Sequence, residues 1–416
     1  MRRSPLIVIF TTVFIDLVGF GIVIPVLPFY AEGTAFNATP RTVGLLFASY
    51  SIMQLIFSPI LGGLSDKHGR RPVLLLSIIG TGIGFIILGL ATTVWMLFIG
   101  RILDGITGGN ISTAQAYIAD VTTEENRAKG MGLIGAAFGL GFIFGPAIGG
   151  ILSHWGIHVP FFFAAALCFA NAMLLFFTLP ETVTADHPAK HSAAGGRSLN
   201  HIIASLKQPK LAFVLVIYFL FIVAFSIMTT SFSLYTMFRF GYDAQHTGYL
   251  FAYVGLIAVI IQGGLIGRLV KRFGEIPLVI FGALCFAISL FAVPFVGPAA
   301  GGLGALLIGG GVFSMGNSLA TPALTSLASK SVGAAQQGVV LGVTQSTASL
   351  ARAVGPSLTA ILISSSIAHL GADGVLHYMS DQSLFVTFWT GSAIMLAATL
   401  LAAYLILRIG QSDLRG

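Results

Sequence analysis

The segment Gly62-Gly-Leu-Ser-Asp-Lys-His-Gly-Arg-Arg-Pro72 is a short polar loop between two long apolar runs. A similar segment, Gly267-Arg-Leu-Val-Lys-Arg-Phe-Gly-Glu-Ile-Pro277, stands between two later apolar runs, with glycine, leucine, glycine and proline in register. Shared glycines alone would be expected by chance in so glycine-rich a chain. A whole loop repeated between equivalent apolar runs instead indicates that the chain arose by duplication of one half.

The composition excludes a soluble globular protein. Asp, Glu, Lys and Arg make up 8% of the 416 residues, hydrophobic residues make up 56%, and the mean hydropathy is +0.94. A soluble domain needs about a quarter of its residues charged to cover its surface, and a single soluble core stops growing at about 250–300 residues. The surface is therefore predicted to face lipid. The 51 glycines agree with this, because small residues let membrane helices approach closely.

Apolar runs that can cross a bilayer recur along the whole chain. A hydrocarbon core about 30 Å thick needs about 20 apolar residues in a helix. Twelve runs qualify: 5–30, 42–64, 73–93, 95–119, 130–153, 160–180, 210–238, 246–268, 277–297, 300–328, 335–367 and 384–408. The first begins directly after Ser4 and is expected to be an uncleaved span rather than a signal peptide.

Basic residues predict the orientation, because they concentrate in cytoplasmic segments. With both termini cytoplasmic, 17 of the 21 Lys and Arg residues lie inside: Arg2, Arg3, Lys67, Arg70, Arg71, Arg127, Lys129, Lys190, Arg197, Lys207, Lys210, Arg268, Lys271, Arg272, Lys330, Arg408 and Arg415. Only Arg41 and Arg239 lie outside, and Arg101 and Arg352 fall within spans. This distribution explains the net charge of +7 without a nucleic-acid partner.

The chain is predicted to divide into two halves of six helices each. Residues 1–180 form the N-terminal half, 181–209 a cytoplasmic linker, and 210–416 the C-terminal half. The linker is the longest polar stretch of the cytoplasmic side, with Pro188 and several charges. The Gly-Pro pair at 145–146 in the fifth span is echoed at 355–356 in the eleventh.

Asp16 is the first candidate functional residue. It lies about 16 Å into the first span at 1.5 Å per residue, where an ionised carboxylate costs about 3 kcal/mol. Such a residue can take up and release a proton as its access to water changes. The alternative is a hydrogen-bonded structural aspartate near a helix break, since Gly19, Gly21 and Pro25 follow it.

Three more ionisable residues lie within spans. Arg101 and Asp104 are three residues apart and share a helix face, so they form either a local ion pair or part of a proton site. Arg352 is the only ionisable residue deep in the second half. An unpaired arginine there is expensive, so we expect it to meet an acid across the bundle or to bind an anionic group of a substrate.

Amide side chains within spans are candidates for lining a mostly apolar substrate cavity. These are Gln54, Asn110, Gln115, Gln262, Asn317 and Gln345, with the aromatic residues Tyr50 and Tyr253 nearby and Arg352 as the charged member. Each amide alone fits an interhelical hydrogen bond equally well.

Four motifs together resemble the major facilitator superfamily. They are the loop Gly62–Pro72, Arg101-Ile-Leu-Asp-Gly105 with Gly108-Gly109, Gly141-Phe-Ile-Phe-Gly145-Pro146-Ala-Ile-Gly149-Gly150, and Asp16-Leu-Val-Gly-Phe-Gly-Ile-Val-Ile-Pro25-Val-Leu-Pro28. The third and fourth resemble the drug/proton antiporter branch, and residues 10–150 are close to tetracycline/proton antiporters. The resemblance implies an all-α membrane fold of twelve transmembrane helices in two pseudo-symmetric halves.

The resemblance also implies roles for particular residues. It assigns proton coupling to Asp16, Arg101 and Asp104, a cytoplasmic charge latch of the outward-open state to Asp66, Arg70, Asp120 and Arg127, and an antiporter gate or seal to Gly141, Gly145, Pro146, Gly149 and Gly150. Plain cytoplasmic loops would explain the basic residues of the latch but not its acids. Generic helix packing is the alternative for the glycine motif, and both readings can hold.

The chain departs from the tetracycline exporters in three places. An acidic position of their third helix corresponds to Gly84, the segment 277–297 contains no acid, and Arg352 is foreign to that subgroup. A tetracycline–metal complex is therefore not the expected substrate, whereas a broader exporter is.

We therefore predict a secondary transporter, not an enzyme, that exports amphiphilic small molecules in exchange for protons by alternating access. It would be a monomer spanning the inner (cytoplasmic) membrane of the cell, with substrate, protons and lipid as partners. No cofactor, metal or ATP site is expected, because no Walker loop or Cys/His cluster is evident and Cys168 and Cys285 lie in different halves. The alternatives are a nutrient uniporter or symporter, and a receptor or adaptor that transports nothing.

Overall fold

The computed structural model describes residues 5–33, 36–182, 209–332, 337–364, 369–370 and 376–413, and almost all of them are helical. The N-terminal helices are α1 (Pro5–Glu32), α2 (Pro40–His68), α3 (Arg70–Gly89), α4 (Val94–Thr107), α5 (Asn110–Val121), α6 (Glu124–Ser153) and α7 (Val159–Thr178). The C-terminal elements are α9 (Pro209–Phe240), α10 (Ala244–Ile260), the π-helical turn η1 (Ile261–Leu265), α11 (Ile266–Phe273), α12 (Glu275–Ala292), the 3-10 turn η2 (Val293–Phe295), α13 (Gly302–Lys330), α14 (Gln337–Leu362), the strands β1 (His369–Leu370) and β2 (Leu376–His377), and α15 (Asp381–Asp413).

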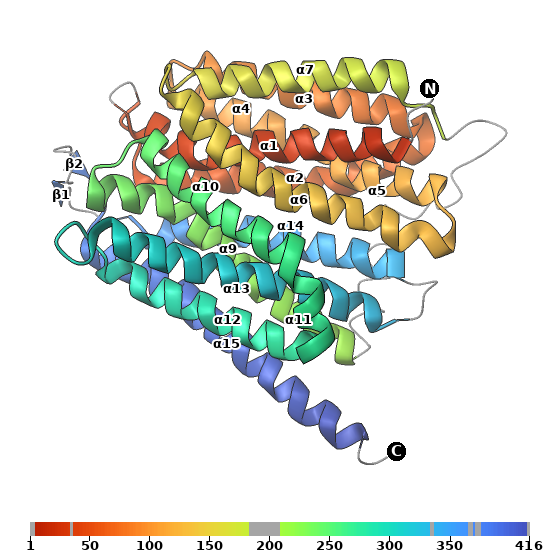
Figure 1. Cartoon of the computed structure of the whole chain (residues 1–416). Coiled ribbons are helices and arrows are strands. Elements are labelled where there is room, and N and C mark those ends of the chain that lie inside the picture. The colour runs from red at the N-terminus through yellow and green to blue at the C-terminus, as the bar shows by residue number, and fades with distance from the viewer. Residues whose placement is uncertain are drawn as a thin grey trace.

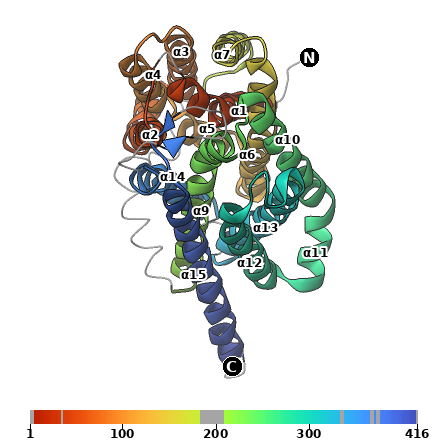
Figure 2. The ribbon, with the colours of Figure 1, turned by 90° about the vertical axis from the view of Figure 1, so that its left-hand side faces the viewer.

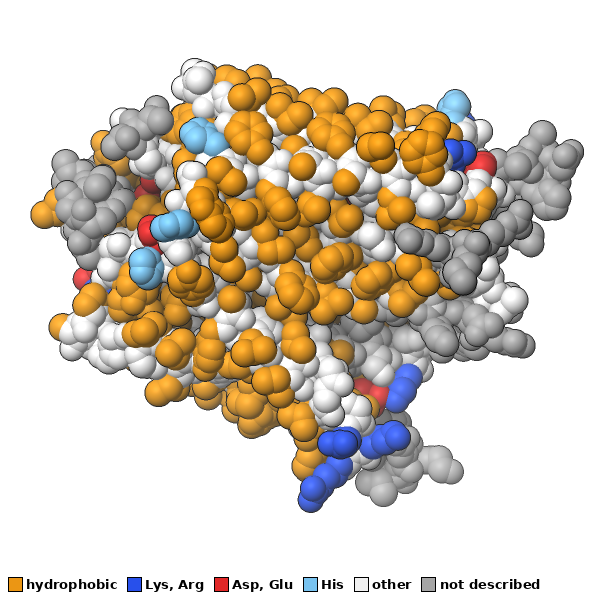
Figure 3. Space-filling model, turned by 45° about the horizontal axis from the view of Figure 1, so that its top comes forward, with side chains coloured by type: hydrophobic (Ala, Val, Ile, Leu, Met, Phe, Trp, Pro, Cys, Tyr) orange, Lys and Arg blue, Asp and Glu red, His pale blue; other side chains and the backbone are white. Residues whose placement is uncertain are grey.

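Ten helices of the described residues are long and apolar enough to cross a membrane. They are α1, α2, α3, α6, α7, α9, α10 with α11, α12 with η2, α13 and α15. With α14 and the α4–α5 pair, the helices would account for the twelve predicted spans, and the count of twelve stays a prediction. Exposed apolar side chains cover much of the face in Figure 3, as expected of a surface in lipid.

The predicted span 95–119 is not one helix but two. α4 ends at Thr107, Gly108 and Gly109 follow, and α5 begins at Asn110. The Gln54 side chain donates a hydrogen bond of 2.9 Å to the carbonyl of Gly108 at this break. Apolar periodicity does not reveal such a break, because the contact comes from a neighbouring helix.

The repeated loops have the same conformation. Gly69 between α2 and α3 has φ 100°, and Gly274 between α11 and α12 has φ 80°. L side chains rarely adopt this left-handed region, so glycine is needed at both one-residue joints. The alignment of the two loop repeats gives these two glycines equivalent positions, and their similar φ angles support the duplication.

Helices α1–α7 and α9–α15 form two groups that lie side by side with their axes roughly along one direction (Figure 1). The view along the bundle separates the same two groups, with α1, α2 and α6 facing α9, α10 and α14 (Figure 2). The predicted linker 181–209 lies mostly outside the described residues, so its boundaries remain a prediction.

We name the two ends of the bundle by the segments that lie there. The linker end carries the α2–α3 and α11–α12 joints and the C-terminal end of α13, and the hairpin end carries the β1–β2 hairpin together with the α1–α2, α3–α4 and α6–α7 joints (Figure 1). In Figure 3, Lys and Arg side chains gather near one end of the molecule, and the exposed Arg268, Lys271 and Arg272 of α11 lie at the linker end.

Candidate functional site

A cavity of about 610 Å³ lies between the two groups of helices. Side chains of α1, α2, α5 and α6 line it on one side, and side chains of α9, α10, α13 and α14 line it on the other. A volume of this order suits one drug-sized molecule.

The two helix groups touch at the hairpin end. A Cβ added to Gly150 of α6 would lie 2.5 Å from Cα of Gly248 in α10, and one added to Gly44 of α2 would lie 2.7 Å from Cα of Ala360 in α14. The Ser233 hydroxyl donates to the carbonyl of Ile24 across the same interface, at 3.3 Å. These backbone approaches close the hairpin end.

The cavity extends toward the linker end. Thr325, Ser326, Ser329 and Lys330 line it, and they occupy the last turns of α13 at that end. The closed hairpin end and this polar extension show that the cavity is approached from the linker end.

Aromatic rings form a continuous wall of the cavity. The centroids of Phe20 and Phe142 are 5.7 Å apart, those of Phe142 and Phe225 are 5.6 Å apart, and those of Phe225 and Phe313 are 6.1 Å apart. The wall therefore runs from α1 through α6 to α9 and α13, joining both halves. Sequence analysis missed these residues because phenylalanine in a membrane span is equally typical of a lipid-facing or core position.

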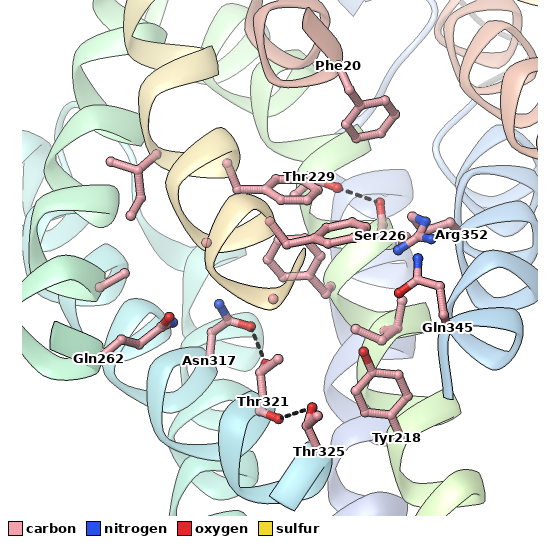
Figure 4. Close-up of a pocket in the computed structure, with 18 of the residues that line it drawn as sticks. Phe20, Tyr218, Ser226, Thr229, Gln262, Asn317, Thr321, Thr325, Gln345 and Arg352 are labelled. Carbon is pink, nitrogen blue, oxygen red and sulfur yellow. Dashed lines mark hydrogen bonds between the residues drawn. The ribbon is translucent and has the colours of Figure 1, made fainter. Parts of the chain in front are cut away.

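The polar groups of the cavity come mostly from the second half (Figure 4). Four predicted amides line it: Gln115, Gln262, Asn317 and Gln345. Figure 4 shows Gln345 beside Arg352 on the α14 side, while Gln262 and Asn317 lie on the opposite side, below the aromatic rings. Hydroxyl groups that were not predicted from the sequence add further hydrogen-bonding capacity. They belong to Ser226, Thr229 and Thr321.

The remaining predicted cavity residues lie elsewhere. Tyr50 and Gln54 line a much smaller space of about 10 Å³ next to the cavity, which Arg352 also lines. Asn110 lines neither space and is fully buried. Tyr253 is not a lining residue, although its hydroxyl lies near the backbone of Gly311.

The partly buried Asp16 and the fully buried Asn110 form a hydrogen-bonded pair. The Asn110 amide nitrogen donates to Oδ1 of Asp16 over 2.8 Å. Oδ1 of Asn110 is also buried and has no hydrogen-bond partner among the described residues. A buried carbonyl without a donor is costly, and a protonated Asp16 would carry the O–H that could satisfy it. The pair thus has the composition of a proton-binding site.

Arg101 and Asp104 form a second pair, and this one is buried. Nη1 of Arg101 lies 2.8 Å from Oδ2 of Asp104, and both side chains are nearly inaccessible. The Arg101 guanidinium also lies over the Tyr50 ring, 4.2 Å from its centroid, and the Tyr50 hydroxyl accepts a hydrogen bond from Gln54. The local ion pair expected from the spacing is therefore present, and its proton role remains a proposal.

Gly84 lies directly against this second pair. A Cβ at Gly84 would come within 3.2 Å of the Asp104 Cβ and 3.0 Å of the carbonyl of Gly100. The position at which relatives were expected to carry an acid therefore has no space for one here, and Asp104 is the carboxylate at this point of the N-terminal half.

Three of the four residues of the predicted charge latch form an ion-pair cluster at the linker end, and the latch function stays a prediction. Nη1 of Arg70 lies 2.5 Å from Oδ1 of Asp66, and its Nε lies 3.0 Å from Oδ2 of Asp120. Arg70 is fully buried, so these are the contacts that make its burial tolerable. Arg127, the fourth predicted member, lies in α6 with its side chain outside the described part of the molecule.

Glu181 joins the same cluster and was not predicted. Its two carboxylate oxygens accept hydrogen bonds from the backbone N–H groups of Arg70 and Arg71, at 2.9 and 3.0 Å. A carboxylate at a helix N-terminus satisfies free donors and interacts favourably with the helix dipole. The sequence held only a weak signal, since the cap lies more than a hundred residues from the helix that it stabilises.

The glycines of the fifth-span motif pack against α1. Added Cβ atoms at Gly141, Gly145 and Gly149 would lie 2.5 Å from the Leu17 Cβ, 2.6 Å from the Gly21 Cα and 2.8 Å from the Ile22 carbonyl, respectively. Gly150 instead meets Gly248 across the two halves, and Pro146 lines the cavity. The motif thus combines helix packing with the closed hairpin end, so both predicted readings find a structural counterpart.

Comparisons with known proteins agree with this architecture. The family model described as Major Facilitator Superfamily matches residues 9–356. The class H tetracycline resistance protein of Pasteurella multocida is 32% identical over 97% of this chain and 96% of its own length. Multidrug resistance protein 2 of Bacillus subtilis is 32% identical over 87% and 89%, respectively. The crystal structure of the human organic anion transporter MFSD10 (TETRAN) has a TM-score of 0.70 at 25% identity, covering 96% of this chain and 99% of that chain.

Proposed function

Since the chain belongs to the major facilitator superfamily and is a membrane transporter rather than an enzyme, we propose that it exports amphiphilic small molecules in exchange for protons. The observation that carries the proposal is the Asp16–Asn110 pair, a carboxyl group held by an amide in the interior of a membrane span. The names of the relatives, which include tetracycline resistance and multidrug resistance proteins, support export of drug-like molecules.

The pair suits both protonation states of Asp16. When Asp16 is ionised, the Asn110 N–H would stabilise its charge through the 2.8 Å hydrogen bond that the structure contains. When Asp16 is protonated, its O–H has the free Oδ1 of Asn110 as an acceptor. Because neither state leaves the carboxyl group unsatisfied, a proton can be exchanged there without unfolding the span.

The linker end would face the cytoplasm. This assignment rests on the 17 basic residues expected on that side and on the exposed cations of α11. The structure would then represent the inward-facing state, with the cavity accessible from the cytoplasm and the hairpin end closed. For a bacterial inner membrane, both termini would be cytoplasmic.

Transport would proceed by rocking of the two halves about the cavity. In the outward-facing state Asp16 would take up a proton, and in the inward-facing state it would release that proton as substrate enters the cavity. The Asp66–Arg70–Asp120 cluster lies within the N-terminal half and is formed in this state, so a latch of the outward-open state would need added contacts from the C-terminal half. The driving force would be the proton gradient alone, with no cofactor.

Vesicles with an imposed pH gradient test this function directly. Purified full-length protein in liposomes should accumulate an aromatic dye, offered in separate assays as the cation ethidium and the anion carboxyfluorescein, when the lumen is acidic, because an antiporter moves substrate toward the acidic side. Reversing the gradient should reverse the flux, a protonophore should abolish it, and protein-free liposomes would correct for passive trapping. A uniporter would only equilibrate the dyes, a symporter would accumulate one under the opposite gradient, and a receptor would move neither; each outcome would refute the proposal.

A further inference from the structure

Arg352 is a cation in the cavity without a counter-ion. Within the described part of the chain, no carboxylate lies within 4.0 Å of its guanidinium. Its polar contact is a 3.2 Å hydrogen bond from Nη2 to the Ser349 hydroxyl one turn earlier, and the Phe138 ring lies 5.5 Å from its Cζ. A guanidinium has five N–H donors, so most of them face the cavity unused.

The described lining of the cavity as a whole is positively charged, like Arg352. Its described lining contains two cations, Arg352 and Lys330, and no Asp, Glu or His. Lys330 is paired with the carboxylate of Glu275, which does not itself line the cavity. Arg352 therefore supplies the uncompensated charge of this site.

The partly buried carboxylate Asp16 does not serve as the missing counter-ion in this state. Asp16 is held by Asn110 in the N-terminal half. The small space that Arg352 shares with Tyr50 and Gln54 has a volume of about 10 Å³ and is otherwise lined by apolar and aromatic residues. That leaves room for at most one water molecule.

The planar donors of a guanidinium fit a carboxylate through two parallel hydrogen bonds, and those of Arg352 are accessible from the cavity. Figure 4 places the Gln345 amide beside Arg352 as a further donor, with Ser226 next to them and the aromatic rings adjacent. Arg352, Gln345 and the aromatic rings together would fit a molecule with an acidic group at one end and an aromatic body at the other.

We propose that the substrates of this transporter are amphiphilic aromatic acids, whose carboxylate binds Arg352 and Gln345 while the aromatic body packs on Phe138, Phe142 and Phe225. This proposal rests on the proposed transport function and deepens it by naming the substrate class. The apolar wall and the cavity volume would accept many amphiphiles, and Arg352 selects the sign of their charge.

Two xanthene dyes with related ring systems test the sign of charge. Fluorescein carries a carboxylate and is anionic at neutral pH, whereas rhodamine 6G is an ester and a cation. Binding to the full-length protein in nanodiscs is measured by fluorescence anisotropy, without a proton gradient. Wild type should bind fluorescein at least about tenfold more tightly than rhodamine 6G, which corresponds to one charge-assisted interaction.

Three variants separate charge recognition from folding. Arg352→Gln should weaken fluorescein binding about tenfold and change rhodamine 6G binding less than about twofold. Arg352→Lys, which keeps the charge but not the planar pair of donors, should lose less fluorescein affinity than Arg352→Gln. The matched control Lys271→Gln removes an exposed cation of α11 that does not line the cavity, and should leave fluorescein binding within about twofold.

Each result decides the proposal. Equal binding of both dyes by the wild type, equal loss of both in Arg352→Gln, or a loss of fluorescein affinity in Arg352→Lys as large as that in Arg352→Gln would overturn it. Should Arg352→Gln not fold, the wild-type preference still decides. Fluorescein binding without any transport would contradict the proposed function alone, whereas proton-driven ethidium transport by a protein that does not prefer fluorescein would contradict only the substrate class.

Discussion

At the scale of single residues, unmet hydrogen-bond capacity marks the sites. Asn110 holds Asp16 through one of its polar atoms and leaves the other free, and Arg352 uses one of its donors on Ser349. Buried polar groups in native proteins are almost always satisfied. The buried Oδ1 of Asn110 is an exception that a proton on Asp16 would satisfy, whereas Arg352 is open to the cavity.

Asp16→Asn should abolish proton coupling and preserve the fold. The asparagine keeps an acceptor for the Asn110 amide at nearly constant volume, but it cannot bind or release a proton. Substrate-driven proton movement, followed with a pH-sensitive dye in proteoliposomes, should fall to the level of protein-free vesicles, while exchange of substrate for substrate continues.

Asp381→Asn is the matched control for Asp16→Asn. Asp381 is an exposed carboxylate paired with Arg239 at 3.2 Å, so its loss should leave proton movement at the wild-type rate. Asp104→Asn tests whether the second carboxylate shares the role. Wild-type proton flux in Asp16→Asn would transfer the coupling role to Asp104 or end the antiport proposal.

The sequence was sufficient to find the charged residues at this scale but not their partners. Asp16, Arg101, Asp104 and Arg352 stand out because a charge in an apolar run is expensive. Asn110 was predicted to line the cavity, yet it faces Asp16. The sequence does not show which role an amide has, because lining a cavity and hydrogen-bonding a neighbouring helix both suit its polar atoms. For Asn110, the packing of α1 against α5 decides between the two roles.

At the scale of elements, helix ends are fixed by groups distant in sequence. The N-terminus of α3 is capped by Glu181, and the α4–α5 break is held by Gln54. Periodicity predicts where an apolar helix runs, but a break or cap provided by another helix requires tertiary structure. For this reason the sequence predicted one continuous span over 95–119, where the structure has two helices. The repeated glycine joints at 69 and 274, in contrast, could be located from sequence.

Glu181→Gln should weaken the start of α3. One of the two backbone N–H groups would then face an amide nitrogen, and the negative charge near the helix dipole would be lost, at a cost of about 1 kcal/mol. Hydrogen exchange at the amides of Arg70 and Arg71 should accelerate, and the thermal midpoint in detergent should fall.

The control for the cap is Glu275→Gln at the equivalent joint of the second half. Glu275 accepts from Ser326 and from the largely exposed Lys330 rather than capping a distant helix, so a small effect is expected. Unchanged exchange at Arg70 in Glu181→Gln would show that the cap contributes nothing.

Asp66→Asn should slow transport while the protein still inserts and folds. Arg70 would keep Asp120 as its charged partner, so its burial would remain compensated. The variant would loosen one contact between α2 and α3 at the linker end and leave the rest of the N-terminal half packed. Initial rates of uptake of the transported dye in liposomes measure the effect, with melting of the purified protein as the folding control. An unchanged rate would reduce the Gly62–Pro72 loop to a topological signal.

At the scale of the whole molecule, the contact between the halves is made largely by residues with little or no side chain. Gly150 meets Gly248 and Gly44 meets Ala360 at the hairpin end, while the linker end is occupied by the cavity. Composition and the loop repeat predicted two halves and a membrane location. They could not predict which end is closed, because two arrangements of the same halves differ by only a few kcal/mol.

Gly150→Val should shift the protein away from the closed hairpin end. Its side chain would collide with the backbone of Gly248, so the two halves could no longer meet there. A cysteine at the cavity residue Thr230, in a background lacking Cys168 and Cys285, should react several-fold faster with an impermeant maleimide added at the hairpin end.

The control is Gly304→Val on α13, an exposed glycine whose added Cβ would meet nothing within 4 Å. It should leave the labelling rate at that of the parent. Equal labelling of Gly150→Val and the parent would mean that the contact between Gly150 and Gly248 does not control opening at the hairpin end.

The uncompensated guanidinium of Arg352 has a consequence for the energetics of transport. A monovalent cation exported for one proton moves no net charge, so the membrane voltage contributes nothing to its export. A monovalent anion exported for one proton moves two elementary charges in the same direction, and an inside-negative potential of 100 mV then contributes about 4.6 kcal/mol per cycle. Export through this site would be strongly electrogenic, and a cell could drive it by voltage even where the pH on the two sides of the membrane is equal.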